Sequence, residues 1–217
     1  MNYPAPNKKE IFNKDYFYGR KLSNYVNYEK LDNDFRWKPI VKILKELKIS
    51  GKILDIGCAF GYFLKRAAPL FQELYGLDIS DFAIKLAKKE LPKAELRVLD
   101  IDKAELPYPD EYFDLITAFD VLEHTSSIPG ALNKIIKKIK RGGYLIFSTP
   151  MKNTWAGRIF RFFDRDVSHI SVPTKLELIG FVEQSGLEII KQNSFINAGY
   201  FRIYGIPQTC EFVLRKR

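Results

Sequence analysis

Cysteine is scarce in this sequence, and so is histidine. The 217 residues include only two cysteines, Cys58 and Cys210, too few for the disulfide framework of a small secreted domain or for a cysteine-based metal cluster. We therefore expect both thiols to be reduced, and the sequence predicts no metal site. Chemistry that needs an imidazole must use His124 or His169, because the chain has no other histidine.

Long apolar runs are also lacking. No stretch approaches the length that crosses a bilayer, and the N-terminal M-N-Y-P-A-P-N-K-K-E has no apolar core of the kind found in secretory signals. We therefore expect a cytoplasmic protein. A length of 217 residues, with 46% hydrophobic and 28% charged residues, is typical of one globular domain with a sizeable core and leaves no room for a second enzyme domain.

Acidic residues are outnumbered by basic ones, which gives a formal net charge of +9. Much of the excess lies on expected helix faces, as with Lys134, Lys137 and Lys138, where solvation is the usual reason for lysine. The charge is therefore a weak argument for a nucleic-acid partner. It favours acidic partners in general, including phosphorylated substrates and anionic membrane surfaces.

The sequence I-L-D-I-G-C-A-F-G, residues 53–61, predicts a buried strand that breaks into a glycine-rich turn. Asp55 lies near the carboxyl end of this strand, where open α/β sheets bind their ligands. Gly57 and Gly61 let the backbone adopt positive φ and let a ligand approach without a Cβ in the way. A helix is expected at Phe60–Phe71, so the stretch predicts a cradle for a nucleotide-like ligand.

Aspartate ends the next two expected strands as well. The sequence E-L-Y-G-L-D-I-S places Asp78 one βαβ unit after Asp55, where an acid can accept both ribose hydroxyls of an adenosine. The sequence E-L-R-V-L-D-I-D then ends its strand at Asp100. Three successive strands that end in aspartate are a stronger signal than any one glycine motif.

These segments resemble the class I, Rossmann-like S-adenosylmethionine-dependent methyltransferases, in particular the small-molecule type of methyltransferase types 11 and 23. The resemblance continues through F-D-L-I-T-A-F-D-V-L-E-H, Phe113–His124, and G-G-Y-L-I-F-S-T-P, Gly142–Pro150, and it covers Pro39–Phe195. Family members usually carry a third glycine where this chain has Ala59, so we expect slightly altered turn geometry without loss of binding. A dinucleotide site fits less well, because G-C-A-F-G is not the G-x-G-x-x-G that seats a pyrophosphate.

The resemblance implies an α/β fold with a doubly wound, seven-stranded, mostly parallel sheet, helices on both faces and an antiparallel final strand. It implies an N-terminal lid segment at 1–33, a class I methyltransferase domain at 34–217, and an acceptor-region insertion near 151–173. We expect the lid segment to be irregular with one short helix. Its D-Y-F-Y-G, Asp15–Gly19, resembles a lid over the cofactor, and its tyrosines are equally compatible with covering an apolar edge of the sheet.

Periodicity and end signals predict the remaining elements. Apolar spacing predicts helices at Asp34–Lys48 and from Ser126 to Gly142, with Ser80 and Thr174 as N-caps of two more. Later strands are expected at Phe113–Ala118, Tyr144–Ser148, Leu187–Phe195 and Thr209–Arg215. The last of these should pair antiparallel with the one before it. Residues 196–207 form a loop or insertion that the pattern does not place.

In this family the cofactor supplies the reactive methyl group and the protein orients the reactants, so no catalytic triad is needed. None is visible in the sequence. By resemblance, Asp55, Gly57 and Gly61 would form the cradle near the methionine portion of S-adenosylmethionine. The backbone of Cys58 and Ala59 would lie beside that portion.

Two further strand ends would hold the adenosine portion of the cofactor. Asp78 would accept hydrogen bonds from the ribose hydroxyls, with Ile79 against the face of the adenine. Asp100 would accept a hydrogen bond from the adenine amino group, with Ile101 beside it. Helix capping is the alternative role for Asp78, and the coincidence of three strand-end acids argues against it.

The reacting methyl group would be presented at the end of the fourth strand. Phe119 and Asp120 would face the cofactor there, although Asp120 is equally compatible with a structural role. His169 lies in the expected acceptor region and is the candidate proton acceptor, with a packing role equally open. His124 resembles a histidine that many relatives carry after the fourth strand, and we expect it to be structural.

A basic and aromatic segment, W-A-G-R-I-F-R-F-F-D-R at Trp155–Arg165, follows the fifth strand. At helical spacing its arginines share one face, opposite Ile159, Phe160 and Phe163. Such a helix is compatible with burial against the domain, with a flap over an apolar acceptor, or with peripheral contact with an anionic membrane. We favour acceptor binding, because the segment follows a strand whose carboxyl end lies at the crevice.

The leading hypothesis is S-adenosylmethionine-dependent methyl transfer to a small-molecule acceptor, such as a quinone precursor, a sugar or a lipid-linked intermediate. A nucleic-acid methyltransferase is one rival. It is weakened because D-V-L-E at 120–123 stands where base-amino methylases usually have N-P-P-Y or D-P-P-Y. The other rival is a cofactor-binding partner subunit without catalysis, which the intact strand-end acids argue against.

Overall fold

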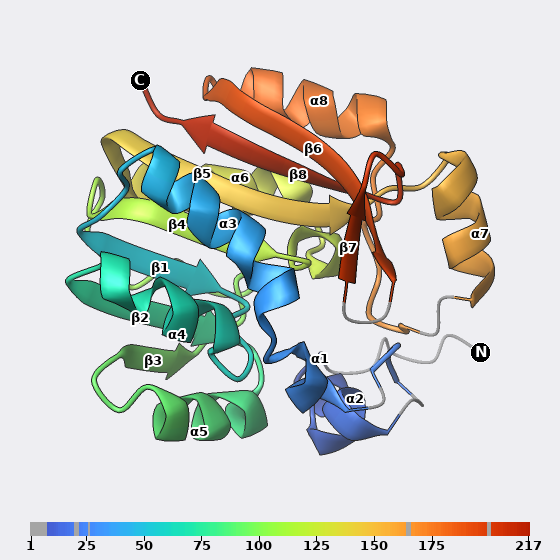
Figure 1. Cartoon of the computed structure of the whole chain (residues 1–217), viewed down its shortest axis with the longest axis horizontal. Coiled ribbons are helices and arrows are strands. Elements are labelled where there is room, and N and C mark those ends of the chain that lie inside the picture. The colour runs from blue at the N-terminus through green and yellow to red at the C-terminus, as the bar shows by residue number, and fades with distance from the viewer. Residues whose placement is uncertain (1–7, 20–21, 26, 164–165, 199–200) are drawn as a thin grey trace.

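The chain folds around one eight-stranded, mostly parallel sheet (Figure 1). The computed structural model describes residues 8–19, 22–25, 27–163, 166–198 and 201–217. The strands are Lys52–Ile56 (β1), Glu73–Asp78 (β2), Glu95–Val98 (β3), Phe113–Phe119 (β4), Ile139–Pro150 (β5), Glu188–Ala198 (β6), Phe201–Tyr204 (β7) and Thr209–Arg215 (β8). Their order is β3-β2-β1-β4-β5-β8-β6-β7. The strands β1 to β5 are parallel and β8 is antiparallel to both β5 and β6, which confirms the predicted fold class.

Helices cover both faces of the sheet. They are Lys8–Ile11 (α1), Lys14–Tyr18 (α2), Asp34–Glu46 (α3), Tyr62–Ala67 (α4), Asp81–Glu90 (α5), Ile128–Lys138 (α6), Trp155–Phe163 (α7) and Lys175–Gln184 (α8). Apolar side chains of α3, α4 and α5 pack together on one face, and those of α6 and α8 pack on the other. The short helices α1 and α2 lie near the carboxyl ends of the strands, as does α7 (Figure 1).

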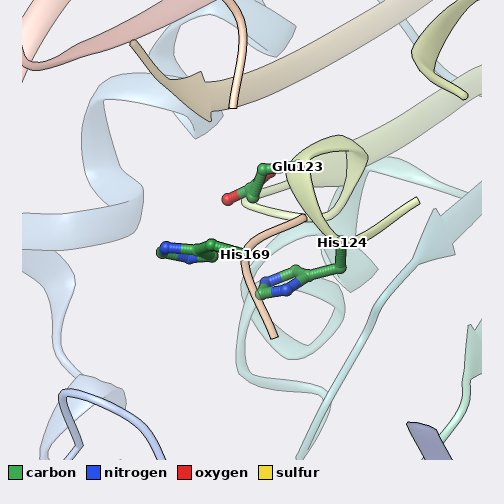
Figure 2. Close-up of side chains that lie close together, drawn as sticks. All are labelled: Glu123, His124 and His169. Carbon is green, nitrogen blue, oxygen red and sulfur yellow. The ribbon is translucent and has the colours of Figure 1, made fainter. Parts of the chain in front are cut away.

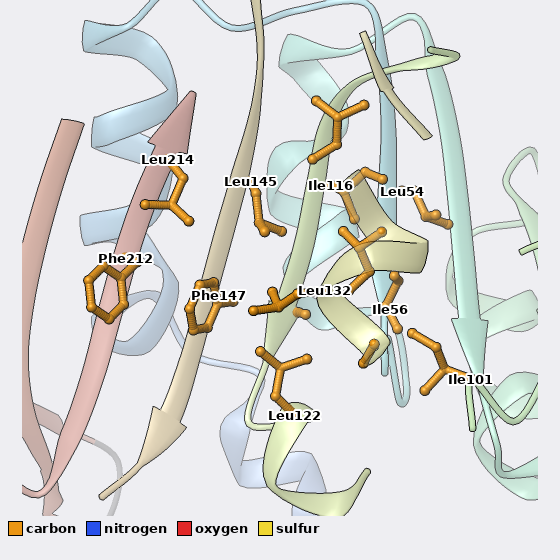
Figure 3. Packing of buried hydrophobic residues seen from close by; sticks show 14 of the residues in the cluster. Leu54, Ile56, Ile101, Ile116, Leu122, Leu132, Leu145, Phe147, Phe212 and Leu214 are labelled. Carbon is orange, nitrogen blue, oxygen red and sulfur yellow. The ribbon is translucent and has the colours of Figure 1, made fainter. Parts of the chain in front are cut away.

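Strand β1 shows how the sequence divides the core into two layers. Successive side chains of a strand point to opposite faces of its sheet. Accordingly, Ile53 belongs to the cluster under α3 and α4, whereas Leu54 and Ile56 belong to the cluster under α6 (Figure 3). Each such side chain contributes about 1.5–3 kcal/mol when it is fully buried. The apolar side chains at Ile53, Leu54 and Ile56 thus follow from burial of β1 on both faces.

The prediction of seven strands was wrong by one. Strand β6 continues beyond Phe195 to Ala198 and pairs antiparallel with β7, in a register that joins Phe195 to Tyr204. Strand β7 lies within the 196–207 stretch that the sequence pattern did not place. A four-residue segment has too little periodicity to reveal a strand, and it is stabilised here by pairing with the extension of β6.

The predicted helix from Ser126 to Gly142 ends earlier, at Lys138. Ile139 continues the helical spacing of Ile135, yet it adopts an extended conformation and pairs with Phe113 at the start of β5. Both Ile139 and Phe113 are fully buried. Tertiary burial of Ile139 in the sheet therefore overrides the local helical pattern.

Other helices begin or end closer to where their capping residues predict. Ser80 caps α5 through a bond from the Ala83 N–H, and Thr174 with Glu177 forms the predicted capping box of α8. The helix expected at Phe60–Phe71 is shorter, with α4 followed by a 3₁₀ turn at Ala68–Leu70 that contains a proline. The N-terminal segment holds α1, α2 and a 3₁₀ turn at Tyr28–Leu31, where one short helix was expected.

Candidate functional site

The turn after β1 has the left-handed backbone that its glycines suggest. Gly57 and Gly61 have φ values of +71° and +80°, and Gly57 also has no room for a side chain, since an added Cβ would lie 2.3 Å from Cγ2 of Val121. Ala59 is also left-handed, with φ of +44°. An L-residue with a side chain adopts this conformation at a cost of about 1–2 kcal/mol. The turn is therefore tight and slightly strained at Ala59.

A pocket opens where the parallel strands end, and it encloses about 800 Å³ of space, part of it open to solvent. Most of the predicted cofactor residues line it, namely Gly57, Ala59, Asp78, Ile79, Asp100, Ile101, Phe119 and Asp120. Asp55 and Cys58 instead line a smaller adjoining cavity that shares Gly57, Phe119 and Asp120 with the pocket. Gly61 lines neither cavity and is the N-cap of α4.

Asp78, at the end of β2, is held by backbone donors. Its Oδ2 accepts a hydrogen bond of 2.8 Å from the Ala59 N–H, and its Oδ1 accepts one of 2.8 Å from the Ser80 N–H. Burial raises the pKa of Asp78 to about 6, although these two bonds act in the opposite direction. Each carboxylate oxygen has two lone pairs, so each keeps capacity for one more donor.

Asp100, which follows β3, accepts a hydrogen bond at only one of its two carboxylate oxygens in the described part of the chain. Its Oδ1 accepts a bond of 3.0 Å from the Asp102 N–H. Its Oδ2 is buried and has no hydrogen-bond donor within the described part of the chain, while the Nζ of Lys103 lies 4.0 Å away. A buried carboxylate oxygen without a donor is unfavourable, so a ligand N–H at this point of the pocket would be stabilising.

Asp55 lies within the sheet and is more buried than the other two acids. The Oγ1 of Thr117 on β4 donates a hydrogen bond of 2.6 Å to its Oδ1. Burial raises the pKa of Asp55 to about 7, and the bond from Thr117 lowers it by less. Burial also raises the pKa of the neighbouring Cys58 thiol.

Asp120 connects the strand end to α3. It has φ of +54°, its Oδ1 accepts a bond of 2.9 Å from Ser148 Oγ, and its Oδ2 lies 3.1 Å from Nη2 of Arg36. Arg36 lines the smaller cavity, and the sequence reasoning missed it. Its only signal was a cation among the apolar residues of the predicted helix. Because Asp120 is bound on both sides and also lines the pocket, it is placed for a structural role and for ligand contact.

The N-terminal segment supplies an aromatic wall to the pocket, formed by Phe12, Tyr16, Phe17, Tyr25 and Tyr28. The wall is anchored to the turn after β1, since the ring centroids of Phe17 and Tyr28 lie 4.8 and 4.9 Å from that of Phe60. It is also anchored to the segment before α8, because Tyr16 donates a bond of 2.7 Å to Asp166. Lys8 joins α1 to the turn after β4 through the His124 carbonyl at 2.6 Å. Sequence reasoning assigned none of these residues to the site individually.

The two histidines lie side by side, with ring centroids 4.9 Å apart. His124 lines the pocket, although it was expected to be structural, whereas His169 is outside the lining. His169, in the segment before α8, instead forms a cluster with Glu123 and His124, which lie in the turn that follows β4 (Figure 2). Its Nε2 lies 3.9 Å from Oδ2 of Asp166. The structure therefore places His169 next to His124 and outside the lining of the pocket.

The predicted amphipathic segment forms α7, and several of its side chains are exposed. Trp155, Ile159 and Phe162 are among the exposed large apolar residues, and Arg158 is exposed as well. Arg165 lies outside the described residues. In the described part of the chain, no helix combines the length and apolar character that a membrane crossing requires.

Comparison with known proteins identifies the family. Residues 29–192 match the family described as "Methyltransferase domain". The chain is 26% identical over 141 residues to a probable S-adenosylmethionine-dependent methyltransferase of Mycolicibacterium smegmatis, covering 63% of this chain and 54% of that protein. It is 33% identical over 105 residues to a ubiquinone biosynthesis O-methyltransferase of Alkalilimnicola ehrlichii, covering 47% and 42%. The chain thus spans about half the length of these curated relatives.

A solved structure shares the fold of this chain over most of the length of both proteins. The S-adenosylmethionine-dependent methyltransferase of Thermotoga maritima superposes with a TM-score of 0.67 at 21% sequence identity, covering 88% of this chain and 94% of that one. At this identity the likeness supports the fold alone. Together with a family match over most of the sequence, it shows that the chain belongs to the class I S-adenosylmethionine-dependent methyltransferases.

Proposed function

We propose that the chain methylates a small-molecule acceptor and binds S-adenosylmethionine in the pocket at the strand ends. When bound, this cofactor supplies a methyl group activated by a sulfonium, and the chain's own residues have to bind and orient the reactants. The observation that carries the proposal is the buried Oδ2 of Asp100, which has no hydrogen-bond donor among the described residues and lies one strand away from Asp78.

The pocket residues fit the adenosine portion of the cofactor. An adenine amino group would supply the donor that Asp100 Oδ2 lacks. The ribose hydroxyls would use the remaining lone pairs of Asp78, whose position is fixed by the Ala59 and Ser80 N–H groups. Ile79 and Ile101 supply apolar surface for the base. These four pocket residues are the core of the proposed cofactor site.

We assign the amino-acid portion of the cofactor to the smaller cavity. Asp55, Cys58 and Arg36 line it, and Gly57 borders both cavities. A guanidinium recognises a carboxylate through charge-assisted hydrogen bonds, so we assign Arg36 to the methionine carboxylate. Gly61 would act through the geometry of the turn that it closes.

For the acceptor, we propose a small molecule such as a quinone precursor, a sugar or a lipid-linked intermediate. The aromatic wall offers apolar surface for such a molecule, and the N-terminal segment that carries it is proposed to act as a lid. Low-identity relatives named as ubiquinone biosynthesis O-methyltransferases support an oxygen acceptor. We propose that His169 acts on the acceptor side of the site and not on the cofactor.

Calorimetry with S-adenosylhomocysteine tests cofactor binding. Asp78→Ala and Asp100→Asn should each weaken binding by about 1–3 kcal/mol, because each removes an acceptor and leaves a buried donor of the ligand unpaired. Asp81→Ala is the matched control, since Asp81 is an exposed acid at the start of α5 that forms an ion pair with Lys85, one turn along the same helix. Unchanged affinity in the Asp78 and Asp100 variants would remove these residues from the site.

Mass spectrometry of pooled candidate acceptors tests catalysis. Purified protein and S-adenosylmethionine should yield a product heavier by one methylene unit from a small molecule. Methylation of an oligonucleotide would favour the nucleic-acid rival. Cofactor binding without any product across pools that include such acceptors would favour a partner subunit without catalysis.

A further inference from the structure

We propose that Glu123, His124 and His169 bind a divalent transition-metal ion on the acceptor side of the pocket. Their candidate ligand atoms all lie within 4.8 Å of one another. Figure 2 shows the three side chains projecting toward the same region, two from the turn after β4 and one from the segment before α8. Two imidazoles and a carboxylate are a donor set suited to zinc and to iron, cobalt or nickel.

Glu123 supplies the strongest argument for an occupant. Its side chain is fully buried, and its Oε2 accepts a hydrogen bond of 3.0 Å from Thr149 Oγ1. Its Oε1 is also buried and has no hydrogen-bond partner in the described part of the chain. A buried carboxyl oxygen that lacks a partner is unfavourable. A metal ion would satisfy the unpartnered oxygen and offset the negative charge.

The hydrogen bonds of His124 determine which of its ring nitrogens is free to bind a metal ion. Its Nδ1 lies 3.1 Å from the Ser168 carbonyl oxygen and 2.9 Å from Ser168 Oγ. The Ser168 hydroxyl donates to Asp166, so both Ser168 oxygens accept and Nδ1 must carry the proton. The lone pair is therefore on Nε2. An imidazole fixed through its other nitrogen by such a partner is the usual arrangement at metal sites.

The backbone fixes His169 against the other two residues. The N–H groups of Ile170 and Ser171 donate to the Glu123 carbonyl at 3.0 and 2.9 Å. These bonds join the segment before α8 to the turn after β4, although the two are far apart in sequence. The cluster is thus built into the fold. The sequence predicted no metal site, because that expectation rested on the cysteine count and not on this tertiary contact.

Three protein ligands leave at least one coordination position open, as in catalytic zinc sites. Since His124 also lines the pocket, an acceptor oxygen could take that position. This consequence rests on the proposed function and narrows the acceptor to a molecule with a hydroxyl group. The ion would hold that hydroxyl and lower its pKa.

Titration of chelator-treated protein with Zn²⁺ alone tests the site directly. Calorimetry should give about one ion per chain, and Glu123→Gln and His169→Gln should each weaken binding at least about tenfold. Glu183→Gln, at an exposed position of α8, is the matched control and should bind as the unaltered protein does. Circular dichroism and thermal melting in the absence of metal establish that each variant is folded.

Co²⁺ provides a second readout. Bound to the cluster, it should show visible ligand-field bands without the strong near-ultraviolet band that a thiolate ligand produces. The proposal is overturned if the unaltered protein binds neither ion, if the Glu123 and His169 variants bind like the control, or if the thiolate band appears. Parallel titrations with S-adenosylhomocysteine keep the two proposals apart, because metal binding without cofactor binding would contradict only the proposed function.

Discussion

Replacing Gly57 with alanine should destabilise the protein through two separable effects. The left-handed φ of +71° costs an L-residue with a side chain about 1–2 kcal/mol. The new Cβ would lie 2.3 Å from Cγ2 of Val121, and overpacking of this kind costs about 1–3 kcal/mol. Gly57→Ala should therefore lower the free energy of unfolding by about 2–5 kcal/mol.

A double-mutant cycle separates the two effects. Val121→Ala removes the atom that the new Cβ would meet, so the double variant should recover the packing part and retain the conformational part. The expected coupling energy is about 1–3 kcal/mol in favour of the double variant. Denaturant unfolding followed by tryptophan fluorescence measures it, since Trp37 is buried in the core.

Gly180→Ala is the matched control for the same substitution. Gly180 lies in α8, and an added Cβ would meet nothing within 4 Å. This change should raise the free energy of unfolding by up to about 1 kcal/mol through helix propensity. Two results would contradict this prediction. The Gly57→Ala variant could be as stable as the unaltered protein, or adding Val121→Ala to it could recover none of the lost stability.

Three further predictions concern the core acid, a helix cap and α7. Burial raises the pKa of Asp55 from 3.8 to about 7, so between these pH values the folded state keeps a proton that the unfolded chain loses. The free energy of unfolding should therefore fall as the pH rises from about 4 to about 7. Asp55→Asn should make this fall less steep in denaturation series from acid to neutral pH, and an unchanged slope would contradict the prediction. Thr174→Ala should lower the free energy of unfolding by about 0.5–2 kcal/mol through loss of the capping box, and an unchanged melting curve would argue against it. Replacing the exposed Trp155 and Phe162 with serine should impair methylation if α7 binds the acceptor; if only sedimentation with anionic vesicles is lost, the membrane interpretation is correct.

Sequence patterns alone predicted the parts of the structure that depend on neighbours along the chain. The strand ends that carry Asp55, Asp78 and Asp100 follow from apolar runs broken by polar or glycine residues. Because parallel strands present their carboxyl ends at one edge of a sheet, the sequence was sufficient to predict that these acids lie near one another. The capping box at Thr174 and the N-cap at Ser80 were readable for the same reason, since each cap bonds within one helical turn.

Only the tertiary structure decided which distant residues meet. The ion pair of Arg36 with Asp120, the aromatic wall and the cluster of Glu123 with His169 all join segments that no local pattern connects. Tertiary contacts also decided the conformation of Ile139, which has helical spacing in the sequence and pairs with Phe113 in the sheet. They decided the formation of β7 as well, because this strand pairs with β6. Local propensities are worth a few tenths to about 1 kcal/mol per residue, whereas full burial of one large apolar side chain is worth about 1.5–3 kcal/mol. Where the two compete, the topology that buries the side chain determines the structure.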